Sequence, residues 1–114
     1  MKIALCALFL ITSLTLFAHG PSSIDLTIND SLNLLYVKVY HNVPSVTAHY
    51  IKSIKLIVNG KDLIDERFSR QSSKEFEEAY FLYAPSQTDT SVEISASCNI
   101  FGGKKTKLSS GGEK

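Results

Sequence analysis

Short runs of alternating apolar and polar residues, separated by turn signals, constrain the fold of this chain more than any other feature. One run covers residues 24–28, and a second places the odd-numbered residues from 35 to 41, His41 last, on its apolar face. Residues 92–98 alternate in the same way, and Cys98 closes their apolar face. Because successive side chains of a strand point to opposite faces of a sheet, these runs predict strands that each bury one face.

Four further runs complete a set of seven expected strands. One begins near Tyr50 and ends at Asn59-Gly60, the strongest short hairpin signal in the chain, so residues 63–68 are expected to return beside it. Residues 74–83 contain glutamates that permit a helix, yet their aromatic density favours a strand, and a last strand is expected at residues 105–108. The set predicts an all-β fold, an immunoglobulin-like antiparallel β-sandwich of about seven strands, without the disulfide and core tryptophan of antibody domains.

The start of the chain has the pattern of an export signal. Lys2 precedes an almost wholly apolar run that is too short to span a bilayer comfortably, and Ala18 is a small residue suited to cleavage. We therefore expect residues 1–18 to be a signal peptide, residues 19–108 one domain and residues 109–114 a disordered tail. The mature protein is expected to be periplasmic or secreted, with no membrane span, and its oligomeric state is left open.

Charge argues against nucleic acid as a partner. The chain has 12 Lys and Arg and 11 Asp and Glu, so loss of Lys2 with the signal peptide leaves equal numbers. A group of lysines is interpreted as solvated strand faces rather than a basic patch: Lys52, Lys55, Lys104, Lys105 and Lys107. The sequence contains no nucleotide-binding glycine loop, Cys-x-x-Cys pair or serine-triad context, so kinase, thioredoxin-like and hydrolase functions have no support.

Cys98 is the cysteine that remains once Cys6 leaves with the signal peptide, so the mature chain cannot form an internal disulfide. His19, His41 and His49 are its histidines. His41 and Cys98 each close the apolar face of a strand, and the short loop after His41 can fold back to bring His49 close. The spacing favours a metal site about as much as it favours hydrogen-bonded structural histidines beside a buried thiol.

Two strings resemble the iron domain of the superoxide reductases, the desulfoferrodoxin and neelaredoxin family. The segment that starts His49-Tyr50-Ile51 and runs into Asn59-Gly60 is similar to that family's His-Tyr-Ile-x-x-Ile segment and its hairpin. Cys98-Asn99-Ile100 is similar to the family's Cys-Asn-x-His-Gly motif, and His19-Gly20-Pro21 to its His-x-Pro. The resemblance covers residues 19–108.

The resemblance implies one mononuclear, non-haem iron held by histidine nitrogens in a plane and one axial cysteine sulfur. Carried over to this chain, His19, His41 and His49 would supply nitrogens and Cys98 the sulfur. The family's fourth histidine falls at Phe101, which cannot bind a metal, and Phe17-Ala18 stand where the family has Glu-Lys. Cleavage after Ala18 would leave the free amine of His19 to supply the missing nitrogen. On ligand softness, copper and zinc are alternatives to iron.

The function that the resemblance implies is reduction of superoxide, or of another small oxidant, with electrons from an unidentified donor. One alternative is a copper-binding or electron-transfer protein, although Met1, the only methionine, would leave with the signal peptide. Another is an unmetallated interaction or carrier module in which Phe101 fills the former site. The last is a structural domain in which Cys98 packs as a small hydrophobe.

Overall fold

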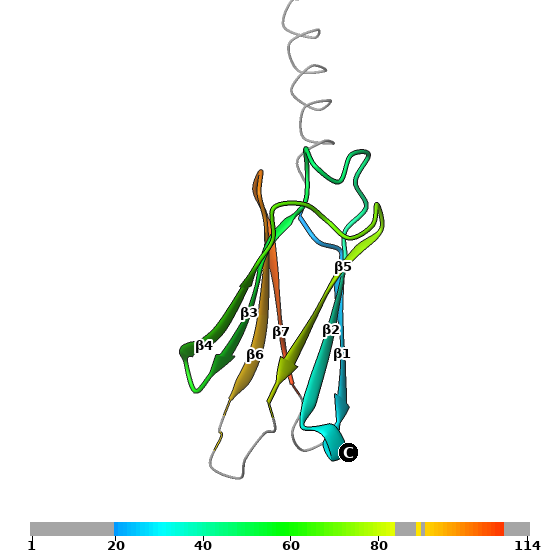
Figure 1. Ribbon diagram of the computed structural model, residues 1–114. Coiled ribbons are helices and arrows are strands. Elements are labelled where there is room, and N and C mark those ends of the chain that lie inside the picture. Colours follow the sequence, from blue (N-terminus) through cyan, green and yellow to red (C-terminus); the bar gives the residue numbers. More distant parts are fainter. Residues whose placement is uncertain (1–19, 84–88, 90, 109–114) are drawn as a thin grey trace, which may run out of the picture.

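A computed structural model of the chain describes residues 20–83, 89 and 91–108, which form two antiparallel sheets lying face to face (Figure 1). The three-stranded sheet has the order β1 (Ser23–Asn29), β2 (Leu34–Tyr40) and β5 (Phe76–Leu82). The four-stranded sheet has the order β4 (Lys61–Arg67), β3 (Ile51–Val58), β6 (Val92–Cys98) and β7 (Gly103–Lys107). The predicted all-β, immunoglobulin-like sandwich is confirmed.

The assignment of strands to the two sheets differs in one respect from that of constant-type antibody domains. There the fourth strand lies in the sheet of the first, second and fifth, whereas here β4 pairs with β3. A short 3₁₀ helix, Asp30–Leu32, joins β1 to β2. Within the described ranges, no helix has the length and apolar character needed to cross a bilayer.

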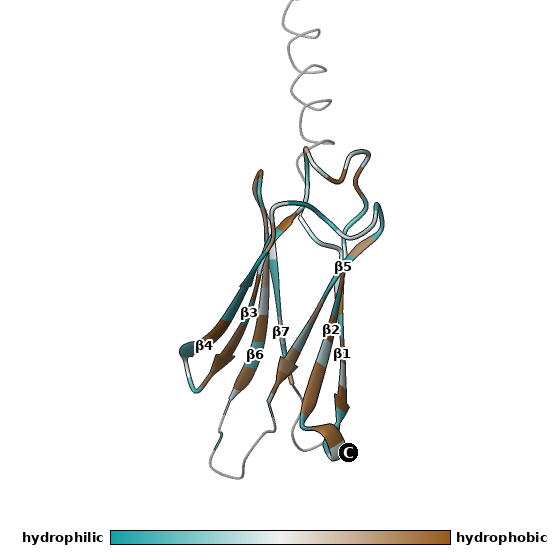
Figure 2. Cartoon of the chain, viewed as in Figure 1, coloured by the Kyte–Doolittle hydropathy of each residue, from teal (hydrophilic) through white to brown (hydrophobic). Residues whose placement is uncertain are grey.

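The core lies between the sheets and follows the alternation of the sequence. Apolar and polar residues alternate along the strands in Figure 2. The inward side chains of β2 and β6 are buried while their neighbours are partly exposed, as predicted. Leu35, Ile54, Leu56 and Ile94 pack in this core beside Phe81, which is 1% exposed. Each such side chain stabilises the fold by about 1.5–3 kcal/mol relative to its exposed state.

The β3–β4 hairpin turns at Asn59-Gly60, where the sequence signal predicted it. Both residues have positive φ, 52° at Asn59 and 82° at Gly60. A two-residue turn with this left-handed backbone matches the twist of the flanking strands, and asparagine and glycine adopt it most readily. The turn therefore sets the pairing of Val58 with Lys61 at the end of the hairpin.

Strand boundaries agree with the sequence to within about one residue except at the starts of β4, β5 and β7, and β5 begins at Phe76, two residues after the expected start at residue 74. The aromatic segment forms strand β5, as its composition predicted. Strands β4 and β7 each begin two residues before the expected start, at Lys61 and Gly103. Both are edge strands with mostly exposed side chains, so the alternation that marks a strand is weak there.

The upper end of the sandwich in Figure 1 collects the ends of strands from both sheets. Strand β2 ends there and β5 begins, and the backbone N–H of His41 donates to the carbonyl oxygen of Glu75 at 2.8 Å. In the other sheet, the first residue of β3, Ile51, pairs with the last residue of β6, Cys98. Residues that follow β2, precede β3 and end β6 therefore meet at this end.

Candidate metal centre

Three predicted site residues come together at the upper end of the sandwich. His41 follows β2, His49 lies just before β3, and Cys98 is the last residue of β6. They are 0%, 7% and 3% exposed respectively. The strand alternation accounts for the inward direction of both side chains, since His41 occupies the first inward position after β2 and Cys98 the last inward position of β6.

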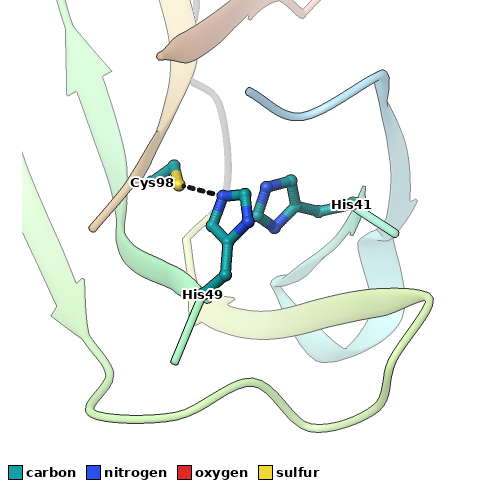
Figure 3. Close-up of side chains that lie close together, drawn as sticks. All are labelled: His41, His49 and Cys98. Carbon is teal, nitrogen blue, oxygen red and sulfur yellow. Dashed lines mark hydrogen bonds between the residues drawn. The ribbon is translucent and has the colours of Figure 1, made fainter. Parts of the chain in front are cut away.

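The donor atoms of the three side chains lie close enough to share one ion. His49 Nε2 is 2.8 Å from Cys98 Sγ, and the rings of His41 and His49 meet edge to face with centroids 4.6 Å apart (Figure 3). One ligand atom from each of the three residues lies within 4.8 Å of the others. Two imidazoles and a thiol therefore form a compact, buried cluster that could hold a metal ion.

The loop between the two histidines folds back as its length allowed. The N–H of Val43 donates to the carbonyl oxygen of Lys74 at 2.8 Å, and the N–H of Gln71 donates to that of Val46 at 3.0 Å. The N–H of His49 closes the loop on the carbonyl oxygen of Ser45 at 3.1 Å. These bonds tie the loop to the segment before β5 and return the chain so that His49 faces His41.

Asn99 joins the two segments that carry His49 and Cys98. Its Oδ1 accepts the N–H of Tyr50 at 2.8 Å, its Nδ2 donates to the carbonyl oxygen of Ala48 at 3.2 Å, and its N–H donates to the carbonyl oxygen of Tyr50 at 3.0 Å. Asn99 thus bonds to both chain neighbours of His49 and directly follows Cys98. Asn99 belongs to the Cys98-Asn99-Ile100 string that carries the resemblance in the sequence, but that resemblance assigned it no role.

Gln71 supports His41 and was not singled out in the sequence. Its side chain is fully buried, and Oε1 lies 2.8 Å from Nδ1 of His41. A glutamine in a loop has no periodic signature, so only its tertiary contacts reveal this position.

The other expected site positions lie outside this cluster. His19 is outside the described residues, but Gly20 lies so close to the turn after Cys98 that a Cβ there would be 3.0 Å from backbone atoms of Gly102 and Gly103. Phe101 is 58% exposed, so the expectation that its side chain fills the former site is wrong. Phe101 lies in the turn from Cys98 to Gly102, which is closed by the N–H of Cys98 donating to the Gly102 carbonyl oxygen at 3.0 Å.

The lysines lie on strand faces, as interpreted from the sequence. Lys52 on β3 and Lys104 and Lys105 on β7 are exposed. Lys55 forms an ion pair with Asp62 across the β3–β4 hairpin, with Nζ 3.2 Å from a carboxylate oxygen. Such exposed pairs contribute little to stability.

The chemistry of the cluster restricts which ions it suits. Imidazole nitrogen and thiolate sulfur together suit iron, copper and zinc, whereas magnesium and calcium prefer oxygen. Burial keeps the cluster away from bulk water, and a bound cation would favour the thiolate form of Cys98. The fold and this cluster define a class: a seven-stranded β-sandwich with a candidate His/His/Cys metal centre between the ends of its two sheets.

Comparison with known proteins places the fold more narrowly. Neither a model of a known protein family nor a curated protein sequence matches the chain. Among solved structures, a superoxide reductase (1Fe-SOR) from Giardia intestinalis matches with a TM-score of 0.56 and 16% sequence identity, over 79% of this chain and 94% of that one. The chain therefore has a superoxide reductase-like fold, in agreement with the resemblance in its sequence.

Proposed function

We propose that this chain is an exported metalloprotein of superoxide reductase type that binds one non-haem iron. The observation that carries the proposal is the convergence of His41, His49 and Cys98 at one end of a superoxide reductase-like sandwich. All three side chains are buried and two of them are in contact, which a chance grouping of surface residues would not provide. His41 and His49 would supply nitrogen ligands, and Cys98 would supply the thiolate.

We include His19 in the proposed ligand set. Adjacent Cα atoms are about 3.8 Å apart, and Gly20 lies against the turn that follows Cys98, so residue 19 is within reach of this end of the sandwich. Cleavage after Ala18 would make His19 the first residue of the mature chain. Its imidazole would then supply one nitrogen, and its free amine would replace the nitrogen that Phe101 cannot provide. In this proposal residues 1–18 are removed, residues 19–108 form the working domain, and the protein is periplasmic or secreted.

Iron in this site would supply one-electron redox chemistry. Conversion of one superoxide anion to hydrogen peroxide takes one electron, here from an unidentified donor, and two protons from the solvent. The chain's own contribution is to hold the two imidazoles and the sulfur in fixed positions and to exclude bulk water from the sulfur side. Phe101 is 58% exposed and is not part of the cluster.

Copper electron transfer is the second candidate. Two histidines and one cysteine are the donor set of trigonal copper sites, and these are the donors that lie together here. Such sites usually add a weak axial methionine sulfur, which this chain lacks after loss of Met1. Iron is therefore the preferred metal.

Metal analysis of protein exported with its own leader tests both candidates. We expect near-stoichiometric iron, a sulfur-to-iron absorption band on oxidation, and consumption of superoxide when a reductant is supplied. The variants Cys98→Ser and His49→Ala should lose the absorption band. Ser97→Ala is the matched control, because Ser97 is next to Cys98 but on the opposite face of β6. Copper with an intense blue band would favour electron transfer, and metal-free protein after reconstitution would overturn the metalloprotein proposal.

A further inference from the structure

We propose that Gln71 is a positioning residue that holds His41 in the tautomer with its proton on Nδ1. In neutral His41 this leaves the lone pair on Nε2, the nitrogen that would bind the metal. The role in metal binding rests on the proposed function, whereas the tautomer is a property of the metal-free protein.

The orientation of the Gln71 amide follows from its backbone partners. Nε2 of Gln71 lies 2.7 Å from the carbonyl oxygen of His41 and 2.8 Å from that of Ser73, and Oε1 accepts the N–H of Ile51 at 3.2 Å. Carbonyl oxygens only accept and a backbone N–H only donates. The reversed amide would place its oxygen against two carbonyl oxygens and its NH₂ group against an N–H. The assignment of Oε1 and Nε2 is therefore determined by three bonds that do not involve the imidazole.

The tautomer of His41 follows from that orientation. Oε1 of Gln71 can only accept, and it lies 2.8 Å from Nδ1 of His41. Nδ1 must then carry the hydrogen, because two acceptors at this distance would repel one another. A histidine that binds metal through one ring nitrogen usually donates a hydrogen bond from the other, which fixes both the tautomer and the ring orientation. Gln71 provides the acceptor that this arrangement requires.

The position of Gln71 is itself held from several directions. Its backbone N–H donates to the carbonyl oxygen of Val46 at 3.0 Å, which ties it to the loop between the two histidines. The next residue, Ser72, donates through its N–H to Oε1 of Glu77 at 3.0 Å, and its hydroxyl bonds to Oε2 of the same carboxylate. Glu77 is buried on the inward face of β5. The amide therefore cannot swing away from His41 without breaking bonds to both sheets.

Nitrogen NMR of the metal-free protein tests the proposal. In the wild type, ¹⁵N shifts of His41 should show the hydrogen on Nδ1. Gln71→Leu removes the acceptor and should shift the tautomer population toward Nε2–H. The same variant should weaken binding of Co²⁺, followed by its visible absorption, by about 10- to 100-fold, as found when such outer partners are removed.

Two further variants separate positioning from a general loosening of the loop. Gln71→Glu keeps an acceptor oxygen beside Nδ1 but sets its second oxygen against the carbonyl oxygens of His41 and Ser73, so it should lose stability and still show the Nδ1–H tautomer. Ser72→Ala loosens the same loop through Glu77 without changing the contact to His41, so its tautomer should match the wild type.

The outcomes distinguish this inference from the proposed function. A wild-type His41 with its hydrogen on Nε2 would overturn the inference, even where Gln71→Leu fails to fold. An unchanged tautomer and unchanged Co²⁺ affinity in a folded Gln71→Leu protein would also overturn it. If the wild type shows the Nδ1–H form, Gln71→Leu shifts it toward Nε2–H, and neither the wild type nor any variant binds a metal, then the metal function fails and the role of Gln71 in setting the tautomer stands.

Discussion

Phe101 shows how little a residue's place in a motif says about its surroundings. It occupies the motif position of a family histidine, yet its side chain is 58% exposed at the tip of the turn between β6 and β7. An exposed side chain neither blocks a buried cluster nor contributes much to packing.

The exposure of Phe101 predicts that its removal is nearly neutral. Phe101→Ala should change the free energy of unfolding by no more than about 0.5 kcal/mol and leave Co²⁺ affinity unchanged. Phe81→Ala is the matched control, since Phe81 is 1% exposed and its truncation should cost about 3–5 kcal/mol. Urea unfolding and Co²⁺ titration give both quantities. A large loss of stability or of affinity in Phe101→Ala would mean that this side chain packs over the site in solution.

At the scale of elements, the β3–β4 hairpin depends on its backbone conformation. Gly60 has φ of +82°, and a Cβ there would have no atom within 4 Å. Gly60→Ala should therefore cost about 1–2 kcal/mol through the left-handed backbone alone. Gly103→Ala gives the contrasting case, because its Cβ would lie 2.9 Å from the carbonyl oxygen of Ala96 and the cost would be steric. Equal stability of Gly60→Ala and wild type in urea would show that the turn conformation differs in solution.

The same pair of strands carries a pH-dependent contact. Ser53 on β3 donates to a carboxylate oxygen of Asp65 on β4 at 2.6 Å, and this bond, with support from Arg67, lowers the pKa of Asp65 below its usual value. A lowered pKa in the folded state contributes stability that is present above the unfolded pKa of about 3.9 and is lost as the pH falls through the folded pKa.

Removal of this hydrogen bond should make the hairpin less sensitive to acid. Ser53→Ala should raise the pKa of Asp65 toward its ordinary value, measured by NMR titration of its carboxyl carbon. The loss of stability on acidification through this range, taken from urea unfolding, should be smaller than in the wild type. In an Asp65→Asn background, Ser53→Ala should no longer change the sensitivity to acid, because the titrating carboxyl group is gone. An unchanged Asp65 titration in Ser53→Ala would contradict the assignment.

On the scale of the whole molecule, a metal would connect the two sheets. His41 follows β2 of the three-stranded sheet, whereas His49 precedes β3 and Cys98 ends β6 of the four-stranded sheet. An ion bound by the folded chain alone stabilises it in proportion to the logarithm of its concentration, by about 2.7 kcal/mol at one hundred times Kd.

Metal binding should therefore raise the unfolding temperature of the whole domain. For a domain of this size, a gain of that magnitude corresponds to a rise in Tm of about 10–20 °C. We expect this rise with Co²⁺ in the wild type, its reversal by a chelator, and its absence in Cys98→Ser. Calorimetry at several Co²⁺ concentrations measures the effect. A Tm that is independent of Co²⁺ in the wild type would contradict metal binding at this site.

The sequence by itself determined the elements and the faces that they bury. Alternation at a period of two residues is a local property, and it placed Cys98 and His41 on the inward side of their strands before any fold was known. The Asn59-Gly60 turn is equally local, because its backbone conformation depends on two residues. The edge strands β4 and β7 were located less accurately, since exposed strands carry little alternation.

Only the tertiary structure decided which residues surround the candidate site. The sheet to which β4 belongs, the approach of His49 to Cys98 and the contacts of Gln71 and Asn99 all depend on how distant segments pack. Hydrogen bonds from loop amides leave no periodic trace in a sequence, so no local pattern could predict them. The exposure of Phe101 likewise follows from no local pattern in the sequence. Local periodicity thus specifies the strands, and packing between sheets specifies the site.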